Sequence, residues 1–77
     1  WLNLNNNKVK NIARLSNLTN LQWLDLSCNP IENIDILEKL ILLDELNLNN
    51  TNIGNILVLE KLKKLKILEL SNTKVKD

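Results

Sequence analysis

A leucine pattern that recurs every 22 residues constrains the fold of this chain more than any other feature. The pattern L-x-x-L-x-L-x-x-N-x-I fits LQWLDLSCNPI, residues 21–31. It returns in LDELNLNNTNI, residues 43–53, and again in LKILELSNTKV, residues 65–75, with Thr at the Asn position. WLNLNNNKV, residues 1–9, matches from the third position onward. Repetition at this spacing predicts stacked units, each of which buries its apolar side against the next.

Two different apolar spacings follow each other within one unit. The L-x-L segment alternates with period two, as in a strand with one buried face. After the Asn position the spacing changes to threes, as in Ile34, Leu37 and Leu40, which suits 3₁₀ turns better than a long α-helix. One unit cannot bury its own leucine row, whereas stacked units can. Each unit is therefore expected to form a short strand followed by a short helical turn.

These residues resemble the leucine-rich repeat family, in particular its class with the 22-residue unit LxxLxLxxNxIxxIxxLxxLxx. That class includes a protein phosphatase 1 regulatory subunit and the bacterial internalins. The resemblance implies an α/β fold, a right-handed solenoid or horseshoe. Its parallel β-sheet would form the concave side, and short helical or 3₁₀ turns the convex side. It also implies binding of partner proteins, usually by the concave face.

The resemblance covers residues 1–77, which hold about three and a half repeats and form a single leucine-rich repeat segment. No polar capping sequence covers the apolar face at either end, and solenoids need such caps. We therefore expect an excerpt of a longer solenoid that lacks both caps. Alone, it is expected to be poorly stable or to associate end to end.

Asparagine explains how the backbone turns with so little glycine. The chain has one Gly and one Pro, while Asn makes up about a fifth of its residues. Asn7 and Asn29 occupy the ladder position, where a side-chain amide can bond the backbone groups of the turn. Thr51 and Thr73 replace Asn in the later units, and a hydroxyl makes fewer such bonds. The ladder is expected to be weaker in the second half.

A second asparagine column precedes the convex segments. It consists of Asn11, Asn33 and Asn55, each followed directly by Ile. Asn favours helix caps and turns because its side chain bonds nearby backbone groups. We predict that these residues start each convex turn.

Composition disfavours several classes of function. The net charge of +1 gives no overall attraction to nucleic acid or to an anionic membrane. The chain has no His, no Gly-rich phosphate loop and no nucleophile beside a base, so we expect no catalytic, cofactor or metal site. Cys28 is the single cysteine and is expected to be exposed and inert. The sequence leaves the cellular compartment of the protein open.

The strand phase assigns the side chains that point outward from the concave sheet. The only aromatic residues, Trp1 and Trp23, fall in one register, and adjacent strands lie about 4.8 Å apart. The two indoles are therefore expected to lie side by side on the open face. Aromatic residues are frequent among those that dominate binding energy. The predicted partner-binding residues are Trp1, Trp23, Asp25, Glu45, Asn47, Ile67 and Glu69.

The charges suggest the chemistry of a partner. Acidic residues gather on the concave face, whereas Lys61, Lys63 and Lys64 are expected on the convex side. The leading hypothesis is a protein or peptide with a basic segment and an apolar anchor. Three alternatives stay open: the indoles only cover each other, the chain is an internalin-like bacterial adhesin segment, or the paired Trp stack nucleic-acid bases. Acidic neighbours disfavour the last, because phosphate contacts supply most of that affinity.

Overall fold

Short strands alternate with short 3₁₀ helices along the chain. The computed structural model describes residues 1–75, which contain four strands and three 3₁₀ helices. The strands are β1 (Leu2–Asn3), β2 (Trp23–Asp25), β3 (Glu45–Asn47) and β4 (Ile67–Glu69). The 3₁₀ helices are η1 (Ala13–Asn17), η2 (Asp35–Lys39) and η3 (Leu57–Lys61).

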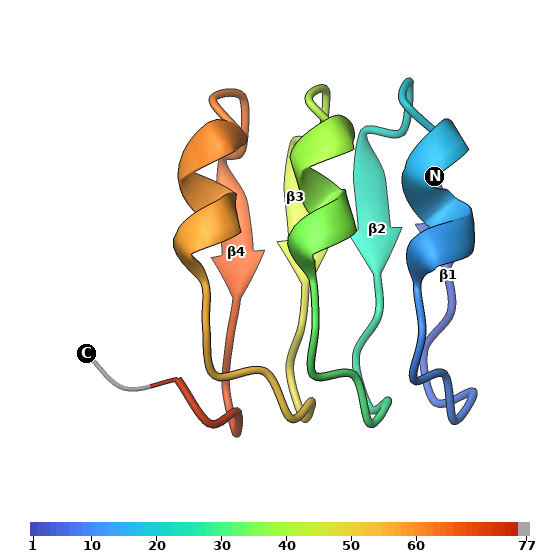
Figure 1. Ribbon diagram of the computed structural model, residues 1–77, viewed down its shortest axis with the longest axis vertical. Helices are drawn as coiled ribbons and strands as arrows, with labels where there is room; N and C mark the ends of the chain where they lie inside the picture. Colours follow the sequence, from blue (N-terminus) through green and yellow to red (C-terminus); the bar gives the residue numbers. More distant parts are fainter. Residues whose placement is uncertain (76–77) are drawn as a thin grey trace.

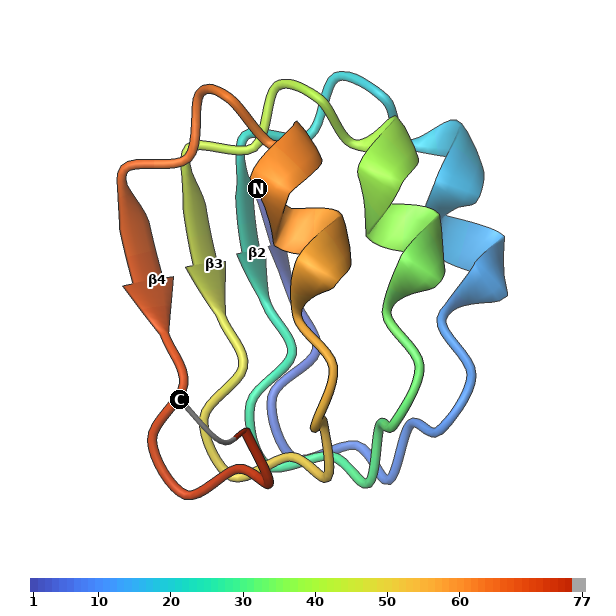
Figure 2. The same ribbon diagram turned by 60° about the vertical axis from the view of Figure 1, so that its left-hand side comes forward.

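The strands form one parallel sheet in chain order, β1-β2-β3-β4. Leu2 pairs with Leu24, Leu24 with Leu46, and Leu46 with Leu68, so the pairing step equals the sequence repeat. Figure 1 shows the helices lying in front of the strands, and Figure 2 shows the same two layers from the side. The predicted parallel sheet with short 3₁₀ turns is confirmed.

The core fills the space between the two layers. On β2 the middle residue, Leu24, is only 1% exposed, and Leu46 on β3 is equally buried. Burial of each such side chain contributes about 1.5–3 kcal/mol. The outermost strand is different, because Leu68 on β4 has no strand beyond it within residues 1–75 and is partly exposed.

The helical turns form because the apolar residues recur every three positions. The N–H of Leu37 donates to the carbonyl of Ile34 at 3.0 Å, and the N–H of Leu40 donates to that of Leu37 at 2.9 Å. Such i to i+3 bonds define a 3₁₀ helix and place every third side chain on one side. All three residues are buried, so that side faces the core.

The second asparagine column starts these turns, as predicted. In each repeat the Asn Oδ1 accepts a hydrogen bond from the N–H of the first helical residue. The pairs are Asn11 with Ala13 (2.9 Å), Asn33 with Asp35 (2.8 Å) and Asn55 with Leu57 (3.0 Å).

The Asn29 side chain links two repeats through backbone groups. It is 2% exposed. Its Oδ1 accepts hydrogen bonds from the N–H groups of Asn7 and Val9, each at 2.9 Å. Its Nδ2 lies within 3.0 Å of three backbone carbonyl oxygens, those of Leu4, Leu26 and Ser27.

Threonine makes fewer of these bonds in the later repeats. Within residues 1–75 the hydroxyl of Thr51 makes one hydrogen bond, to the carbonyl of Leu48 at 2.8 Å. Thr73 donates to the carbonyl of Leu70 at 3.0 Å and accepts the N–H of Val75 at 3.3 Å. Both threonines make fewer bonds than Asn29. The side chain of Asn7 also makes a single one within residues 1–75, to the carbonyl of Asn5 at 3.2 Å, so the expected contrast between the two halves is seen at Asn29 alone.

Asparagine also adopts the left-handed backbone conformation that glycine usually provides at turns. The residue before each ladder position has a positive φ, 58° at Asn6, Cys28 and Asn50 and 57° at Asn72. Among residues other than Gly, Asn adopts this region with the least penalty. Cys28 is the one residue among these four that is not Asn. Its Sγ accepts a contact from the Asn50 amide at 3.6 Å, whereas Asn72 donates to Asn50 Oδ1 at 2.7 Å.

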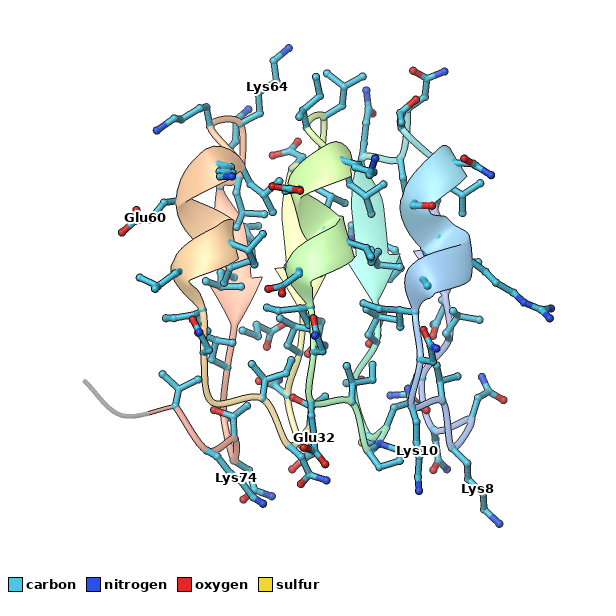
Figure 3. The ribbon with its side chains drawn as sticks, viewed as in Figure 1. Lys8, Lys10, Glu32, Glu60, Lys64 and Lys74 are labelled. Carbon is cyan, nitrogen blue, oxygen red and sulfur yellow. The ribbon has the colours of Figure 1, made fainter. Side chains whose placement is uncertain are left out.

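One ion pair joins two helices on the convex layer. The Nζ of Lys61 on η3 lies 2.9 Å from Oε2 of Glu38 on η2. The hydrogen bond and charge of Lys61 hold the pKa of the Glu38 carboxyl below its usual value, and Glu38 raises the pKa of Lys61 in return. Lys61 thus lies on the convex side as predicted. Lys63 and Lys64 instead occupy the turn between η3 and β4, where Lys64 marks the upper edge in Figure 3.

Among residues 1–75, none of the helices has the length and apolar character that a membrane crossing requires.

Replacing Asn29 with Ala should destabilise the fold far more than replacing Thr51 with Ala. The first change leaves several backbone groups without partners, and we expect a loss of roughly 3 kcal/mol or more. The second removes one hydrogen bond, which contributes about 1 kcal/mol. Urea unfolding followed by tryptophan fluorescence measures both. Equal losses would show that the amide ladder is no stronger than its hydroxyl replacement.

Replacing Cys28 with Asn should stabilise the fold by about 0.5–1 kcal/mol, because Asn tolerates a positive φ better than Cys does. Cys28→Val is the matched control and should destabilise, since a branched side chain is strained in that region. Calorimetric melting temperatures test both changes. A lower melting temperature for Cys28→Asn than for the unaltered chain would contradict this reading of the column.

Replacing Lys61 with Gln should raise the pKa of Glu38 toward its ordinary value. A carboxyl with a depressed pKa stabilises the folded state above its unfolded pKa, and this contribution is lost as the pH falls through the folded pKa. The unaltered chain should therefore lose the ion pair's contribution in acid, and the variant should lack that dependence. An NMR pH titration of the Glu38 carboxyl measures the shift. Lys63→Gln is the control and should leave this pKa in place.

Candidate functional site

The outer face of the sheet carries two rows of side chains that flank the buried leucines. We call these residues the sheet face, and all of them are half-buried or exposed. Their alternation with buried Leu24 and Leu46 confirms the predicted strand phase. The first row is Trp1, Trp23, Glu45 and Ile67, and the second row is Asn3, Asp25, Asn47 and Glu69.

The two indoles lie together at one end of the first row. Their ring centroids are 4.8 Å apart and the ring planes are tilted by 50°. This separation lies in the range of favourable aromatic pairs. Trp1 is 86% exposed, while Trp23 is half-buried. The prediction that the rings lie side by side is confirmed.

A hydrogen bond ties Trp23 to the next strand. Its indole Nε1 donates to Oε2 of Glu45 at 2.7 Å. The two residues pair directly across β2 and β3. Sequence reasoning had treated Glu45 only as an exposed acid and missed this contact. The signal was present, because an indole and a carboxylate that are one repeat apart occupy neighbouring strands.

The short polar side chains of the second row bind their own backbone. Oδ1 of Asp25 accepts hydrogen bonds from the N–H of Ser27 at 2.9 Å and from its hydroxyl at 2.6 Å. Such turns mimic a backbone turn and end the strand. Two of the predicted binding residues, Asp25 and Asn47, therefore have a structural role that the sequence analysis did not assign. The other members of the series are Asn3, which accepts the N–H of Asn5 (2.9 Å), and Asn47, which accepts that of Asn49 (3.0 Å).

A small hollow of about 40 Å³ lies on the sheet face across β2, β3 and β4. Five of the seven predicted binding residues line it, together with two buried leucines. Trp1 and Asp25 lie outside it. The lining residues are Trp23, Leu24, Glu45, Leu46, Asn47, Ile67 and Glu69.

A larger depression of about 640 Å³ lies elsewhere, between the segments that lead into η1 and η2, with Lys10, Glu32 and Asp35 among its lining residues. It is broadly open and holds no aromatic side chain. The sheet face is the stronger candidate, because indoles, carboxylates and an exposed Ile67 come together there.

The sheet face is acidic. Asp25, Glu45 and Glu69 contribute three carboxylates, and within residues 1–75 none of them forms an ion pair with a basic side chain. Their field favours a cationic ligand. In the same part of the chain, no group of three or more His, Cys, Asp or Glu residues is placed to hold a metal ion.

Neither the protein-family models nor the curated proteins gave a match to this chain. Among solved structures, the chain is similar to internalin C2 of Listeria monocytogenes, with 32% identity over 97% of this chain and a TM-score of 0.95. An internalin (inlF) from the same organism shows 27% identity over 91% of this chain and a TM-score of 0.60. The chain spans 33% and 27% of those two chains.

These neighbours identify the family and leave the 22-residue class as a prediction, although the sheet register repeats at that step. Parallel strands, 3₁₀ turns and in-register leucines agree with the similarity in sequence. The chain belongs to the leucine-rich repeat family.

Proposed function

We propose that this chain is a protein-interaction repeat module that binds its partner on the sheet face and catalyses no reaction. The observation that carries the proposal is the Trp1–Trp23 pair, whose ring centroids lie 4.8 Å apart on a face that also carries the carboxylates of Asp25, Glu45 and Glu69. Exposed aromatic surface of this kind marks interaction sites. The similarity to internalins supports a binding role for the repeats.

The partner we propose is a protein or peptide with a basic segment and an apolar anchor. The basic segment would complement the carboxylates of Asp25, Glu45 and Glu69, which lack basic partners within residues 1–75. The apolar anchor would pack on the exposed face of Trp1. Complementary charge of this kind speeds association and selects among partners.

A second candidate is a segment of an internalin-like bacterial surface adhesin, which the likeness to the Listeria structures favours. Such an adhesin would bind its partner with the same sheet face, but it would act at the bacterial surface. Binding of nucleic acid through the paired Trp has less support, because the neighbouring carboxylates repel phosphate.

The decisive variants remove one feature of the sheet face without disturbing its frame. Trp1→Ala should weaken partner binding by about 2 kcal/mol, or roughly thirtyfold, because aromatic residues are frequent among those that dominate binding energy. Asp25→Asn should weaken it several-fold, since Asn keeps the strand-ending turn, as it does at Asn47, but removes the charge. Affinity capture with the full chain, quantified against unaltered protein, measures both effects.

Glu60→Gln is the control, because this exposed glutamate projects from η3 in the helical layer (Figure 3). It should leave capture unchanged. If the Trp1→Ala and Asp25→Asn variants retain the same proteins as the unaltered chain, in equal amounts, the proposal that the sheet face binds the partner is wrong.

A further inference from the structure

We propose that the hollow on the sheet face is a subsite for one arginine side chain of the protein partner. The inference rests on the proposed function and names the group that the acidic part of the surface recognises. The hollow lies across β2, β3 and β4, and Trp1 is not among the residues that line it. The apolar anchor and the arginine would therefore occupy different places.

The volume of the hollow restricts what can enter. A space of about 40 Å³ admits only the end of a side chain and cannot enclose a whole aromatic ring. The planar tip of an arginine suits such a space, because its unbranched stem stays outside and lies along the surface.

Two carboxylates border the hollow, and each accepts one side-chain hydrogen bond. Oε2 of Glu45 accepts the Trp23 indole N–H at 2.7 Å, and Oε1 of Glu69 accepts the Asn49 amide at 3.2 Å. Within residues 1–75, the second oxygen of each carboxylate makes no hydrogen bond. Each glutamate thus uses one oxygen for a hydrogen bond and has the other available to a ligand. The shorter, part-buried bond from Trp23 orients Glu45, so a ligand cation binds there with less loss of side-chain freedom.

The remaining walls suit an arginine better than a lysine. Ile67 is 48% exposed and offers apolar surface to the stem, and the half-buried Trp23 ring borders the same space. A guanidinium group is planar, stacks on indole faces and donates in a fork that matches carboxylates. An ammonium group is a strongly hydrated point charge and gains less from these walls.

The test uses the Trp23 indole N–H as a built-in reporter. The isotope-labelled full chain is titrated with three blocked peptides, Gly-Arg-Gly, Gly-Lys-Gly and Gly-citrulline-Gly, and NMR follows the indole signals. The arginine peptide should shift the Trp23 signal and bind roughly fivefold or more tighter than the lysine peptide. Citrulline has nearly the shape of arginine without its charge, and it should bind weakest.

Variants assign the effect to the hollow. Glu45→Gln and Glu69→Gln should each remove the preference for arginine, and Glu45→Gln retains an acceptor for the Trp23 N–H. Glu60→Gln is the matched control and should preserve the preference. The unaltered chain alone can overturn the proposal. It does so if the arginine peptide binds no more tightly than the lysine peptide, or no more tightly than the citrulline peptide.

The two proposals can fail separately. If partner capture depends on Trp1 and Asp25 but the peptides show no arginine preference, the subsite is wrong and the binding face stands. If the arginine preference is present but capture ignores both sheet-face variants, the subsite exists and the proposed function is wrong.

Discussion

Burial of leucine between adjacent repeats is the interaction on which the rest of the structure depends. No single repeat encloses its own apolar row, so Leu24 becomes buried only when Leu2 and Leu46 lie on either side of it. This pairing fixes the register of the strands. The register in turn determines which side chains share a row, and it places Trp1 beside Trp23 and Trp23 beside Glu45.

Polar side chains complete the frame that the leucines begin. Backbone groups at the turns cannot all bond one another, and Asn29 satisfies five of them from a buried position. Asparagine also takes the left-handed turns at Asn6, Asn50 and Asn72. The solenoid can therefore turn at every repeat with a single glycine in the whole chain.

The fold followed from the sequence because its signals are periodic and local. A spacing of three predicted the 3₁₀ turns at Ile34, Leu37 and Leu40, and alternation predicted the outward rows. Details of the sheet face did not follow. Whether Asp25 faces a partner or its own backbone depends on hydrogen-bond geometry that spacing does not encode, and the same holds for the bond from Trp23 to Glu45. The positive φ of Cys28 was missed because cysteine seldom marks such turns.

The two rows of the sheet face differ in their freedom to vary. In the second row Asn3, Asp25 and Asn47 each end a strand by binding the backbone two residues later, so longer or apolar replacements would disturb the turn. Within residues 1–75, the side chains of the first row make no hydrogen bond to the main chain. Exchange of the first row alone would change the chemistry of the sheet face, while the turns of Asn3, Asp25 and Asn47 keep the strand ends intact. The architecture thus separates a row that is free to vary from a row that supports the main chain.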